Sequence, residues 1–482
     1  MTVSNDKYPA PRLFINGQWR DGGDGVCAIV RDPATGEVLA EVPRASRQDL
    51  DDALDACEAA FEHWRRKPAI DRAATLQRAA VLLRERAAAL GRLMTMEQGK
   101  TLVESTSEFL HSAEAFDWYA AEALRANGRV IPARLPGARQ LVIMEPLGPV
   151  VALTPWNFPA ALPARKIAGA LAAGCSVVLK PSEETPASAI ALAQALADAG
   201  LPAGVLNIVF GEPAEVSTHL IRSNVTRKVT FTGSTPVGRE IARLAAESPK
   251  PCTLELGGHA PVLVFNDADI DKAVVTCVQG KTRNAGQVCT SPTRFFVQDG
   301  IYDAFVSAFA QAMDKVVVGS GLDPASEMGA LANSRRVDAM EELVSDAVAH
   351  GGQLLAGGFR PHPRGNFWRP SLVSEVPDAA KAMEVEPFGP LVLVRRFSTL
   401  EEGLAQANRL PYGLAAYAFT SSAATAVTVC DELQAGGIGI NSFAVSQIEA
   451  PFGGIKNSGY GNEGGHEGLA AFMHPKYVHH VS

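Results

Sequence analysis

The chain has 482 residues, of which 47% are hydrophobic, so it is too long for one ordinary domain and can bury a large core in two or three. The net charge of −8 argues against a nucleic-acid-binding protein, which would need a basic face. No stretch of about 18 apolar residues is free of polar breaks, so we expect a cytoplasmic protein with no membrane partner. The seven cysteines form no CxxC pair, so we expect reduced thiols and no metal site.

The first predicted elements are short strands and hairpins over about residues 12–45, where apolar and turn residues alternate. A helix is expected from Ser46, because Ser46 and Asp49 resemble a capping box and apolar residues follow at steps of three or four. Two more helices are expected over about 70–98 and 102–124, and all three are packing elements.

The middle of the chain alternates between strand and helix patterns, which predicts a doubly wound parallel sheet. The expected strands are 141–144, 150–154, 176–179, 205–209 and 228–231, and the expected helices are 160–173, 187–199, 213–222 and 235–246. A second alternation over about 255–440 predicts a second α/β domain, with strands near 262–265, 293–297, 391–396, 414–419 and 437–440. Surface loops are expected over 320–335 and 356–366. Sheets of this kind bind ligands at the carboxyl ends of their strands.

Two loops at such strand ends carry residues suited to a dinucleotide. Lys180 follows a strand and Glu183 stands three residues later; a carboxylate accepts hydrogen bonds from both ribose hydroxyls and repels a 2′-phosphate, which favours NAD over NADP. Gly233 and Ser234 open a helix, where free amides and a hydroxyl suit a phosphate. GxGxxG is absent, so each motif taken alone also fits an ordinary turn or a solvated strand end.

A cysteine and a carboxylate, each beside glycine, are the candidate reactive groups. Cys289 lies in Arg283-Asn284-Ala285-Gly286-Gln287-Val288-Cys289-Thr290, and Glu255 precedes the pair Gly257-Gly258. A nucleophilic cysteine needs a base that brings in water after the covalent step, and Glu255 suits that role. A lone cysteine is more often an inert small hydrophobe, so the pairing carries the hypothesis.

Two further polar residues have a functional and an ordinary interpretation. Asn157, between Pro155 and Pro159 at a strand end, could donate its amide to an oxyanion, or it could be a turn asparagine. His259 could act as a base, but a core histidine is the commoner outcome, and Glu255 already fills that role.

Seven motifs stand in one order: Asn157, Lys180, Gly233-Ser234, Glu255, Cys289, Glu386-Pro387-Phe388-Gly389-Pro390 and Pro451-Phe452-Gly453-Gly454. In them the chain, from about residue 12 to its end, closely resembles the aldehyde dehydrogenase superfamily, and within it the succinate-semialdehyde and α-ketoglutarate-semialdehyde dehydrogenases. The resemblance implies an α/β fold with a doubly wound dinucleotide-binding domain, an α/β catalytic domain and a small β oligomerisation element. It also implies a homodimer or homotetramer.

The resemblance also implies domain boundaries and residue roles. The NAD-binding domain would comprise 1–121 and 143–254 with about 441–464, the catalytic domain 255–440, and the oligomerisation element 122–142 and 465–482. Cys289 would be the nucleophile, Asn157 with the Cys289 amide the oxyanion hole, and Glu255 the base. The cofactor, NAD with NADP possible, would contact Trp156, Lys180, Ser182, Glu183, Gly233, Ser234, Leu256, Glu386 and Phe388.

Three residues indicate the substrate class. Arg165, Arg283 and Ser446 match positions at which succinate-semialdehyde dehydrogenases hold the substrate carboxylate. Two guanidiniums near one nucleophile suit an aldehyde with a distal carboxylate, so oxidation of succinate semialdehyde to succinate is expected. Arg165 could instead form an ordinary ion pair. The run from Cys289 to Arg294 also resembles the α-ketoglutarate-semialdehyde branch, so that substrate, glutarate semialdehyde or a broad range of aliphatic and aromatic aldehydes remain alternatives.

Rival classes of protein are disfavoured by the same residues. A CoA-acylating dehydrogenase would form the same thioester but has no use for the water-activating Glu255. A non-catalytic nucleotide-binding relative would not need both Cys289 and Glu255. A cofactor-free cysteine hydrolase would need a partner histidine, and no recognisable motif supplies one.

Overall fold

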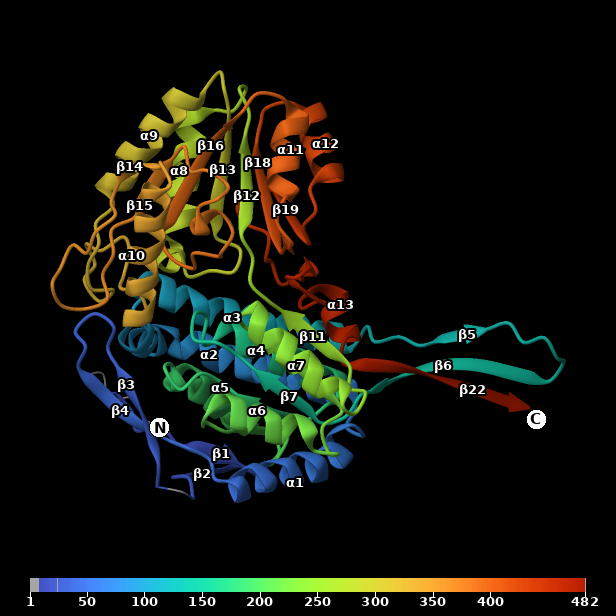
Figure 1. The fold of residues 1–482 in the computed structure, drawn as a ribbon. Helices are drawn as coiled ribbons and strands as arrows, with labels where there is room; N and C mark the ends of the chain where they lie inside the picture. The colour runs from blue at the N-terminus through green and yellow to red at the C-terminus, as the bar shows by residue number, and fades with distance from the viewer. Residues whose placement is uncertain (1–7, 24, 482) are drawn as a thin grey trace.

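The computed structural model describes residues 8–23 and 25–481 and arranges them in two bodies and a projecting arm (Figure 1). The lower body in this view is built on an eight-stranded sheet, the upper body on a seven-stranded sheet and the arm on a three-stranded sheet. Residues 1–7, 24 and 482, which the predicted domains include, lie outside the described residues. No helix in the described chain is long and apolar enough to cross a membrane.

The lower sheet is the predicted doubly wound sheet, except that the strand expected at 141–144 is not part of it. That segment belongs to β6 (Ala138–Pro146), which pairs antiparallel with strands of the arm. Its order is β2 (Gln18–Arg20), β1 (Leu13–Ile15), β9 (Leu206–Ile208), β8 (Val177–Lys180), β7 (Val150–Leu153), β10 (Lys228–Thr232), β11 (Cys252–Glu255) and β21 (Gly459–Tyr460). The strands from β9 to β11 are parallel and fully buried apart from Cys252, as a sheet covered on both faces requires. The strand order reverses between β7 and β10, which is where such sheets bind ligands.

Seven helices surround this sheet: α1 (Arg47–Trp64), α2 (Ala69–Gln98), α3 (Leu102–Ala123), α4 (Ala161–Ala173), α5 (Pro186–Asp198), α6 (Pro213–Arg222) and α7 (Thr235–Ala246). The capping box predicted at Ser46 and Asp49 is present, and Thr101 and Glu104 form a second one at the start of α3. Two small antiparallel pairs complete the outer regions: β3 (Cys27–Arg31) with β4 (Val38–Pro43), and β17 (Tyr412–Gly413) with β20 (Ile455–Lys456).

The upper sheet has the order β14 (Gln353–Ala356), β15 (Ser371–Ser374), β16 (Leu391–Phe397), β13 (Pro292–Gln298), β12 (Ala260–Val264), β18 (Ala415–Phe419) and β19 (Gly437–Ile440). It is parallel except at β14. Its helices are α8 (Ile270–Thr282), α9 (Tyr302–Lys315), α10 (Ser334–Ala349), α11 (Leu400–Asn408) and α12 (Ala423–Glu432), with a short turn of helix η2 (Lys381–Met383).

Two predictions in this body need correction. The sequence pattern missed β14 and β15, because β14 is a largely exposed edge strand and β15 is only four residues long. The expected surface loop 320–335 is partly buried: Met328 to Leu331 are buried, and the Ala330 amide donates to the Gly99 carbonyl. Helix α10 begins inside that range, at Ser334, because the Asn333 side chain caps it.

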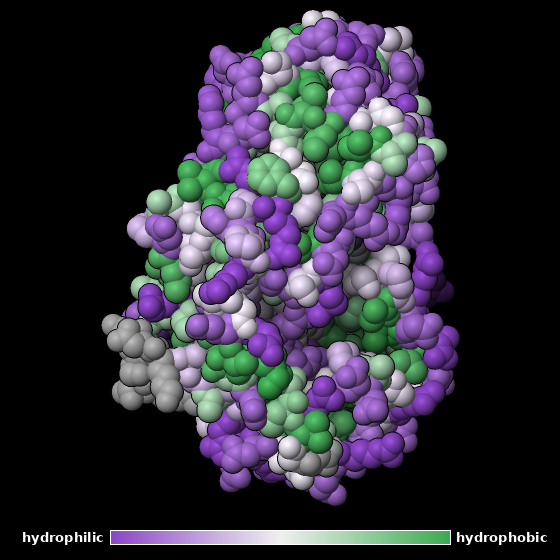
Figure 2. Space-filling view, turned by 60° about the vertical axis from the view of Figure 1, so that its left-hand side comes forward, coloured by the Kyte–Doolittle hydropathy of each residue, from purple (hydrophilic) through white to green (hydrophobic). Residues whose placement is uncertain are grey.

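The arm consists of β5 (Arg129–Ile131), β6 (Ala138–Pro146) and β22 (Met473–Val481), and Figure 1 shows it extending away from both bodies. It joins the two segments predicted for oligomerisation, although β6 runs past residue 142 and α13 (Gly465–Ala470) returns to the lower body. The domain boundaries stay a prediction. On the face in Figure 2 polar residues interrupt the hydrophobic ones, as on most protein surfaces.

Candidate active site

Cys289 lies on a tightly bent loop between α8 and β13. The loop starts with the short helix η1 (Arg283–Gly286), in which Asn284, Ala285 and Gly286 have φ values of 47°, 50° and 72°. Only glycine adopts this region easily, and a Cβ on Gly286 would lie 2.2 Å from the Gly389 carbonyl oxygen. The Cys289 loop is therefore in close contact with the segment that carries Glu386 and Phe388.

Glu255 ends β11 at the carboxyl edge of the lower sheet. It is 2% exposed, and neither carboxylate oxygen has a hydrogen-bond partner among the described residues. Burial raises its pKa, the charge of Glu463 raises it further, and Lys166 and Arg165 lower it. An acceptor with no donor of its own is chemically suited to take a proton from water or from a thiol.

The surroundings of the Cys289 thiol favour its neutral form. Burial raises its pKa to about 12, with Glu386 and Glu255 adding to the rise and Arg165 opposing it. Activation of Cys289 as a nucleophile would therefore need a group that accepts the proton. The backbone next to Cys289 is held by a hydrogen bond, since the Tyr417 hydroxyl donates to the Thr290 carbonyl over 2.7 Å.

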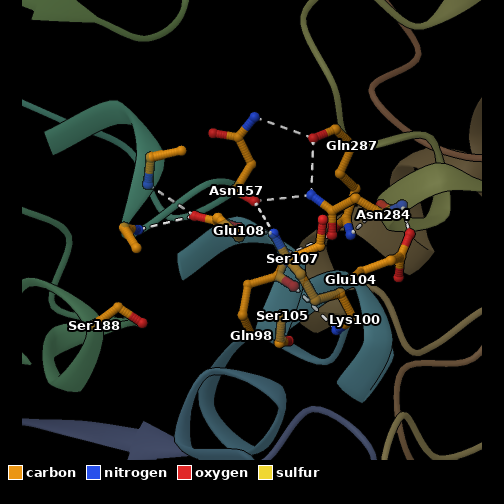
Figure 3. Close-up of polar contacts among 12 residues, drawn as sticks. Gln98, Lys100, Glu104, Ser105, Ser107, Glu108, Asn157, Ser188, Asn284 and Gln287 are labelled. Carbon is orange, nitrogen blue, oxygen red and sulfur yellow. Dashed lines mark hydrogen bonds and ion pairs between the residues drawn. The ribbon is translucent and has the colours of Figure 1, made fainter. Parts of the chain in front are cut away.

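Asn157 is anchored to the Cys289 loop through both its backbone and its side chain (Figure 3). Its Nδ2 donates to the Gln287 carbonyl over 3.1 Å, two residues before Cys289. Its own carbonyl oxygen accepts from Lys100 Nζ and from Asn284 Nδ2, both over 2.8 Å. An amide nitrogen has two N–H donors, so one remains for a ligand.

The sequence did not predict the ion pair of Lys100 with Glu108, through which Lys100 holds the Asn157 carbonyl. Lys100 Nζ lies 2.6 Å from Glu108 Oε2, and the two side chains are only 1% and 3% exposed. Glu108 also accepts from the amides of Ala160 and Ala161, at the start of α4 (Figure 3). Lys100 stands at an unremarkable helix junction and Glu108 within α3, so no local pattern in the sequence signals the pair.

A cavity of about 430 Å³ opens beside Cys289 and contains all three residues predicted for the substrate, Arg165, Arg283 and Ser446. Arg165 donates to the Ser446 carbonyl oxygen, so Ser446 contacts it through its backbone. Within the described chain neither arginine forms a salt bridge, in contrast to the ion-pair alternative for Arg165. No described carboxylate lies within salt-bridge distance of either guanidinium, although Glu104, Glu108 and Glu114 line the same cavity.

The predicted ribose-binding residues Lys180 and Glu183 lie together at the end of β8, close to the segment that follows β9. Lys180 Nζ is 2.7 Å from Glu183 Oε1, and the same carboxylate accepts from the Gly211 amide over 2.9 Å. Ser182 Oγ accepts from the Glu184 amide and so shapes the turn between them. The carboxylate of Glu183 is thus held at the carboxyl edge of the sheet, where a ribose would need it.

The loop after β10 leads into α7 with the features of a phosphate site. Ser234 is the N-cap of α7, but its hydroxyl makes no capping hydrogen bond. The Gly233 amide donates to the Glu255 carbonyl, which ties this loop to the end of β11. Leu256 packs against α7, where a Cβ on Gly238 would lie 2.3 Å from Leu256 Cδ2.

Unpartnered hydroxyls mark the same edge of the sheet. Thr154, just after β7, and Thr232, at the end of β10, each bury a hydroxyl that has no hydrogen-bond partner in the described residues. Buried polar groups are normally paired, so two such hydroxyls beside Ser234 fit a polar ligand at this position.

Glu386 and Phe388 face this edge from the upper body. Glu386 Oε1 accepts from the Gly258 amide over 3.2 Å, and burial raises the Glu386 pKa to about 8. A Cβ at Gly257 would lie 2.4 Å from Glu386 Oε2, so glycine at this position lets the carboxylate approach the backbone closely. Phe388, with a φ of 47°, packs its ring edge-on against Trp156, with centroids 5.5 Å apart.

His259 is a core histidine, as its ordinary interpretation holds. Its ring nitrogens lie 2.7 Å from Thr293 Oγ1 and 2.9 Å from the Ala382 carbonyl oxygen, and burial lowers its pKa. Among the described residues, no group of three or more His, Cys, Asp or Glu side chains could hold a metal ion.

Comparison with known proteins identifies the relatives of this arrangement. The model of the Aldehyde dehydrogenase family matches residues 19–478. The chain is 50% identical over 480 residues to 4-(hydroxymethyl)benzenesulfonate dehydrogenase of Comamonas testosteroni, covering 100% of both chains. It is 42% identical over 478 residues to the NADP(+) succinate-semialdehyde dehydrogenase of Escherichia coli K12, covering 99% of each.

A solved structure agrees with this fold over the whole chain. The crystal structure of succinate-semialdehyde dehydrogenase from Burkholderia pseudomallei superposes with a TM-score of 0.97 at 39% identity and covers 100% of both chains. The fold class predicted from the sequence is therefore confirmed.

Proposed function

The chain belongs to the aldehyde dehydrogenase family and is an oxidoreductase that acts on aldehydes; we propose that its substrate is a short semialdehyde with a distal carboxylate, most simply succinate semialdehyde. The observation that carries this proposal is the pair of arginines, Arg165 and Arg283, that line the Cys289 cavity and form no salt bridge in the described chain. The carboxylates of Glu104, Glu108 and Glu114 line the same cavity, and that of Glu108 is paired with Lys100. Arginine binds carboxylates through a planar fork of N–H groups, which suits an anionic end on the aldehyde.

The proposed chemistry uses three residues. Cys289 Sγ, after losing its proton to Glu255 or to solvent, bonds to the aldehyde carbon and gives a thiohemiacetal oxyanion. The free N–H of Asn157 and the Cys289 amide donate to that oxygen, and loss of one such donor typically costs about 3 kcal/mol. Water that Glu255 deprotonates then attacks the enzyme thioester, and the carboxylic acid leaves.

NAD, with NADP as the alternative, is the proposed cofactor; when bound, it would accept the hydride that leaves the thiohemiacetal carbon, and this loss converts the thiohemiacetal into the thioester. The fit rests on the unpartnered hydroxyls of Thr154 and Thr232 and on the uncapped α7 beside Ser234. Lys180 and Glu183 would hold the adenosine ribose, and Glu386 the nicotinamide ribose.

The remaining predicted contacts would complete the nucleotide site. Trp156, Ser182, Gly233, Leu256 and Phe388 would shape the surfaces around the ribose, phosphate and nicotinamide groups. NAD is favoured over NADP because the Glu183 carboxylate would repel a 2′-phosphate.

The proposed second half-reaction is hydrolysis and not acyl transfer to CoA. Glu255 is a buried acceptor with no partner of its own, which suits a base for water. A non-catalytic relative would have no need to keep such a group unpaired, since burying it costs stability.

An aromatic aldehyde with a remote sulfonate is the second candidate substrate. The relative at 50% identity is named for a benzenesulfonate, and a sulfonate offers the arginines the same negative oxygens as a carboxylate. A cavity of about 430 Å³ has room for an aromatic ring as well as for a four-carbon chain.

We also propose that the chain forms a homodimer or homotetramer in the cytoplasm. The arm exposes apolar side chains, with Val130 77% and Tyr477 56% exposed, that a second subunit would cover.

The test is NAD(P)H formation by the purified protein with a panel of aldehydes and both cofactors. The panel contains succinate, glutarate and α-ketoglutarate semialdehydes, 4-formylbenzenesulfonate, butanal and benzaldehyde. We expect kcat/KM to be highest for an anionic aldehyde with NAD. A preference for butanal or benzaldehyde would show that the arginines do not select the substrate.

A further inference from the structure

We propose that Phe158 and Phe452 are positioning residues that hold the two cavity arginines by their ring faces, so that the guanidinium N–H groups stay available for the substrate anion. This inference rests on the proposed function, since it assigns the means by which the enzyme selects an anionic aldehyde. The two rings come from distant parts of the chain, and each lies under one arginine.

Arg283 is held by Phe158. Its guanidinium carbon lies 5.2 Å from the centre of the Phe158 ring, and no hydrogen bond or salt bridge within the described chain holds the guanidinium. The backbone before Phe158 is anchored, because the Asn157 carbonyl accepts from two donors. Phe158 is partly buried, whereas Arg283 is exposed, so the ring face is the one partner that the described chain offers this guanidinium.

Arg165 is held in the same manner by Phe452. Its guanidinium carbon lies 5.6 Å from the centre of the Phe452 ring, and it also donates to the Ser446 carbonyl. Phe452 is 7% exposed, and its backbone exchanges hydrogen bonds of 2.7 and 2.8 Å with Glu463. This second ring is thus also fixed by the backbone around it.

Lys100 lines the same cavity and shows the effect of pairing a cation with a carboxylate as well as with a ring. It too lies over Phe158, with its Nζ 4.2 Å from the ring centre, but it is paired with the Glu108 carboxylate at 2.6 Å. A carboxylate neutralises a cation and occupies its donors, whereas a ring face attracts the cation without accepting its in-plane N–H groups. Neither arginine is paired with a carboxylate in the described chain, so both keep their charge. Arg283 keeps all its guanidinium donors there, and Arg165 keeps all but the one given to the Ser446 carbonyl.

The test compares charged and uncharged aldehydes in Phe158→Leu and Phe452→Leu. For the best anionic aldehyde of the panel we expect kcat/KM to fall about 5- to 30-fold, mainly through KM, and for butanal to change by less than about 2-fold. Phe158→Tyr keeps the ring face and should restore most of the loss. Phe443→Leu removes a ring of the same cavity that has no cation over it in the described structure, so it should affect both aldehydes alike.

Equal losses for the anionic aldehyde and butanal in the two Leu variants would overturn the inference, because the rings would then only shape the cavity. Unchanged kcat/KM values would overturn it as well. If a Leu variant does not fold, Phe158→Met and Phe452→Met fill the space better and give the same comparison.

Arg165→Ala and Arg283→Ala separate this inference from the proposed function. If neither arginine variant selectively impairs the anionic aldehyde, the proposed substrate class itself fails. If the arginine variants do so and the phenylalanine variants do not, only the role of the rings is wrong.

Discussion

Replacing Lys100 by methionine tests whether the buried ion pair positions Asn157 for catalysis. Lys100→Met removes one of the two donors to the Asn157 carbonyl and leaves the Glu108 carboxylate buried without its cation. Asn284 Nδ2 remains as the other donor to that carbonyl. The change therefore loosens Asn157, the proposed oxyanion donor, without altering Cys289 or Glu255.

Two magnitudes follow from these contacts. Breaking a buried ion pair from one side costs about 3–5 kcal/mol of folding stability, and we expect about 3 because the Ala160 and Ala161 amides still stabilise the carboxylate. Complete loss of an oxyanion donor lowers kcat about 100-fold or more. Since Asn284 still holds the Asn157 backbone, we expect a fall of about 10-fold, within that limit.

The assay measures kcat with succinate semialdehyde and with butanal, and the denaturant midpoint of unfolding. Both aldehydes should lose the same factor in kcat, because both form the same oxyanion. Lys100→Met/Glu108→Gln should recover most of the stability, since no charge is left unpaired, but little of the kcat. An unchanged kcat in the single variant, or recovery of kcat in the double variant, would refute the positioning role.

Three further predictions concern the reactive groups and the cofactor. Cys289→Ala should abolish aldehyde oxidation while NAD binding, measured by fluorescence titration, persists; retained turnover would remove Cys289 from the mechanism. Glu255→Gln should slow deacylation, so that an acyl-enzyme accumulates in intact-protein mass spectra. Because burial raises the Glu255 pKa, kcat of the unmodified enzyme should rise with pH as this carboxyl loses its proton, and the rise should vanish in Glu255→Gln. Glu183→Gln should narrow the preference for NAD over NADP in kcat/KM; an unchanged ratio would show that the carboxylate does not read the 2′ position.

The sequence predicted those parts of the fold in which the pattern of apolar and polar residues reflects burial. Strand β7 is a continuous apolar run, and so is β8 up to Lys180, because both faces of the lower sheet are buried. Strand β10 alternates polar and apolar residues but is rich in β-branched and aromatic side chains, which also favours a strand. Strand β14 has three exposed residues out of four, so its pattern could not be distinguished from that of a loop. The candidate site residues were predicted by motif, and the structure brings Cys289, Arg165, Arg283 and Ser446 to one cavity.

What the sequence could not predict are interactions between residues far apart in the chain. Lys100 meets the Asn157 carbonyl across 57 positions, and Arg165 meets the Ser446 carbonyl across 281. Neither contact has a periodic or local signature, since each depends on how helices and loops of different segments pack. The contacts that hold Asn157 and Arg165 could for that reason be found only from the three-dimensional structure.

The electrostatic state of the site follows from the same packing and bears on how selection and reactivity are linked. Burial keeps both the Cys289 thiol and the Glu255 carboxyl toward their neutral forms, and Arg165 opposes the pKa rise of both. A substrate anion bound at Arg165 would offset part of that effect. Arg283 lies over a different ring, that of Phe158, and can bind the same substrate anion. The anion would then neutralise only part of the Arg165 charge, and the remainder would still lower the Cys289 pKa and favour the thiolate.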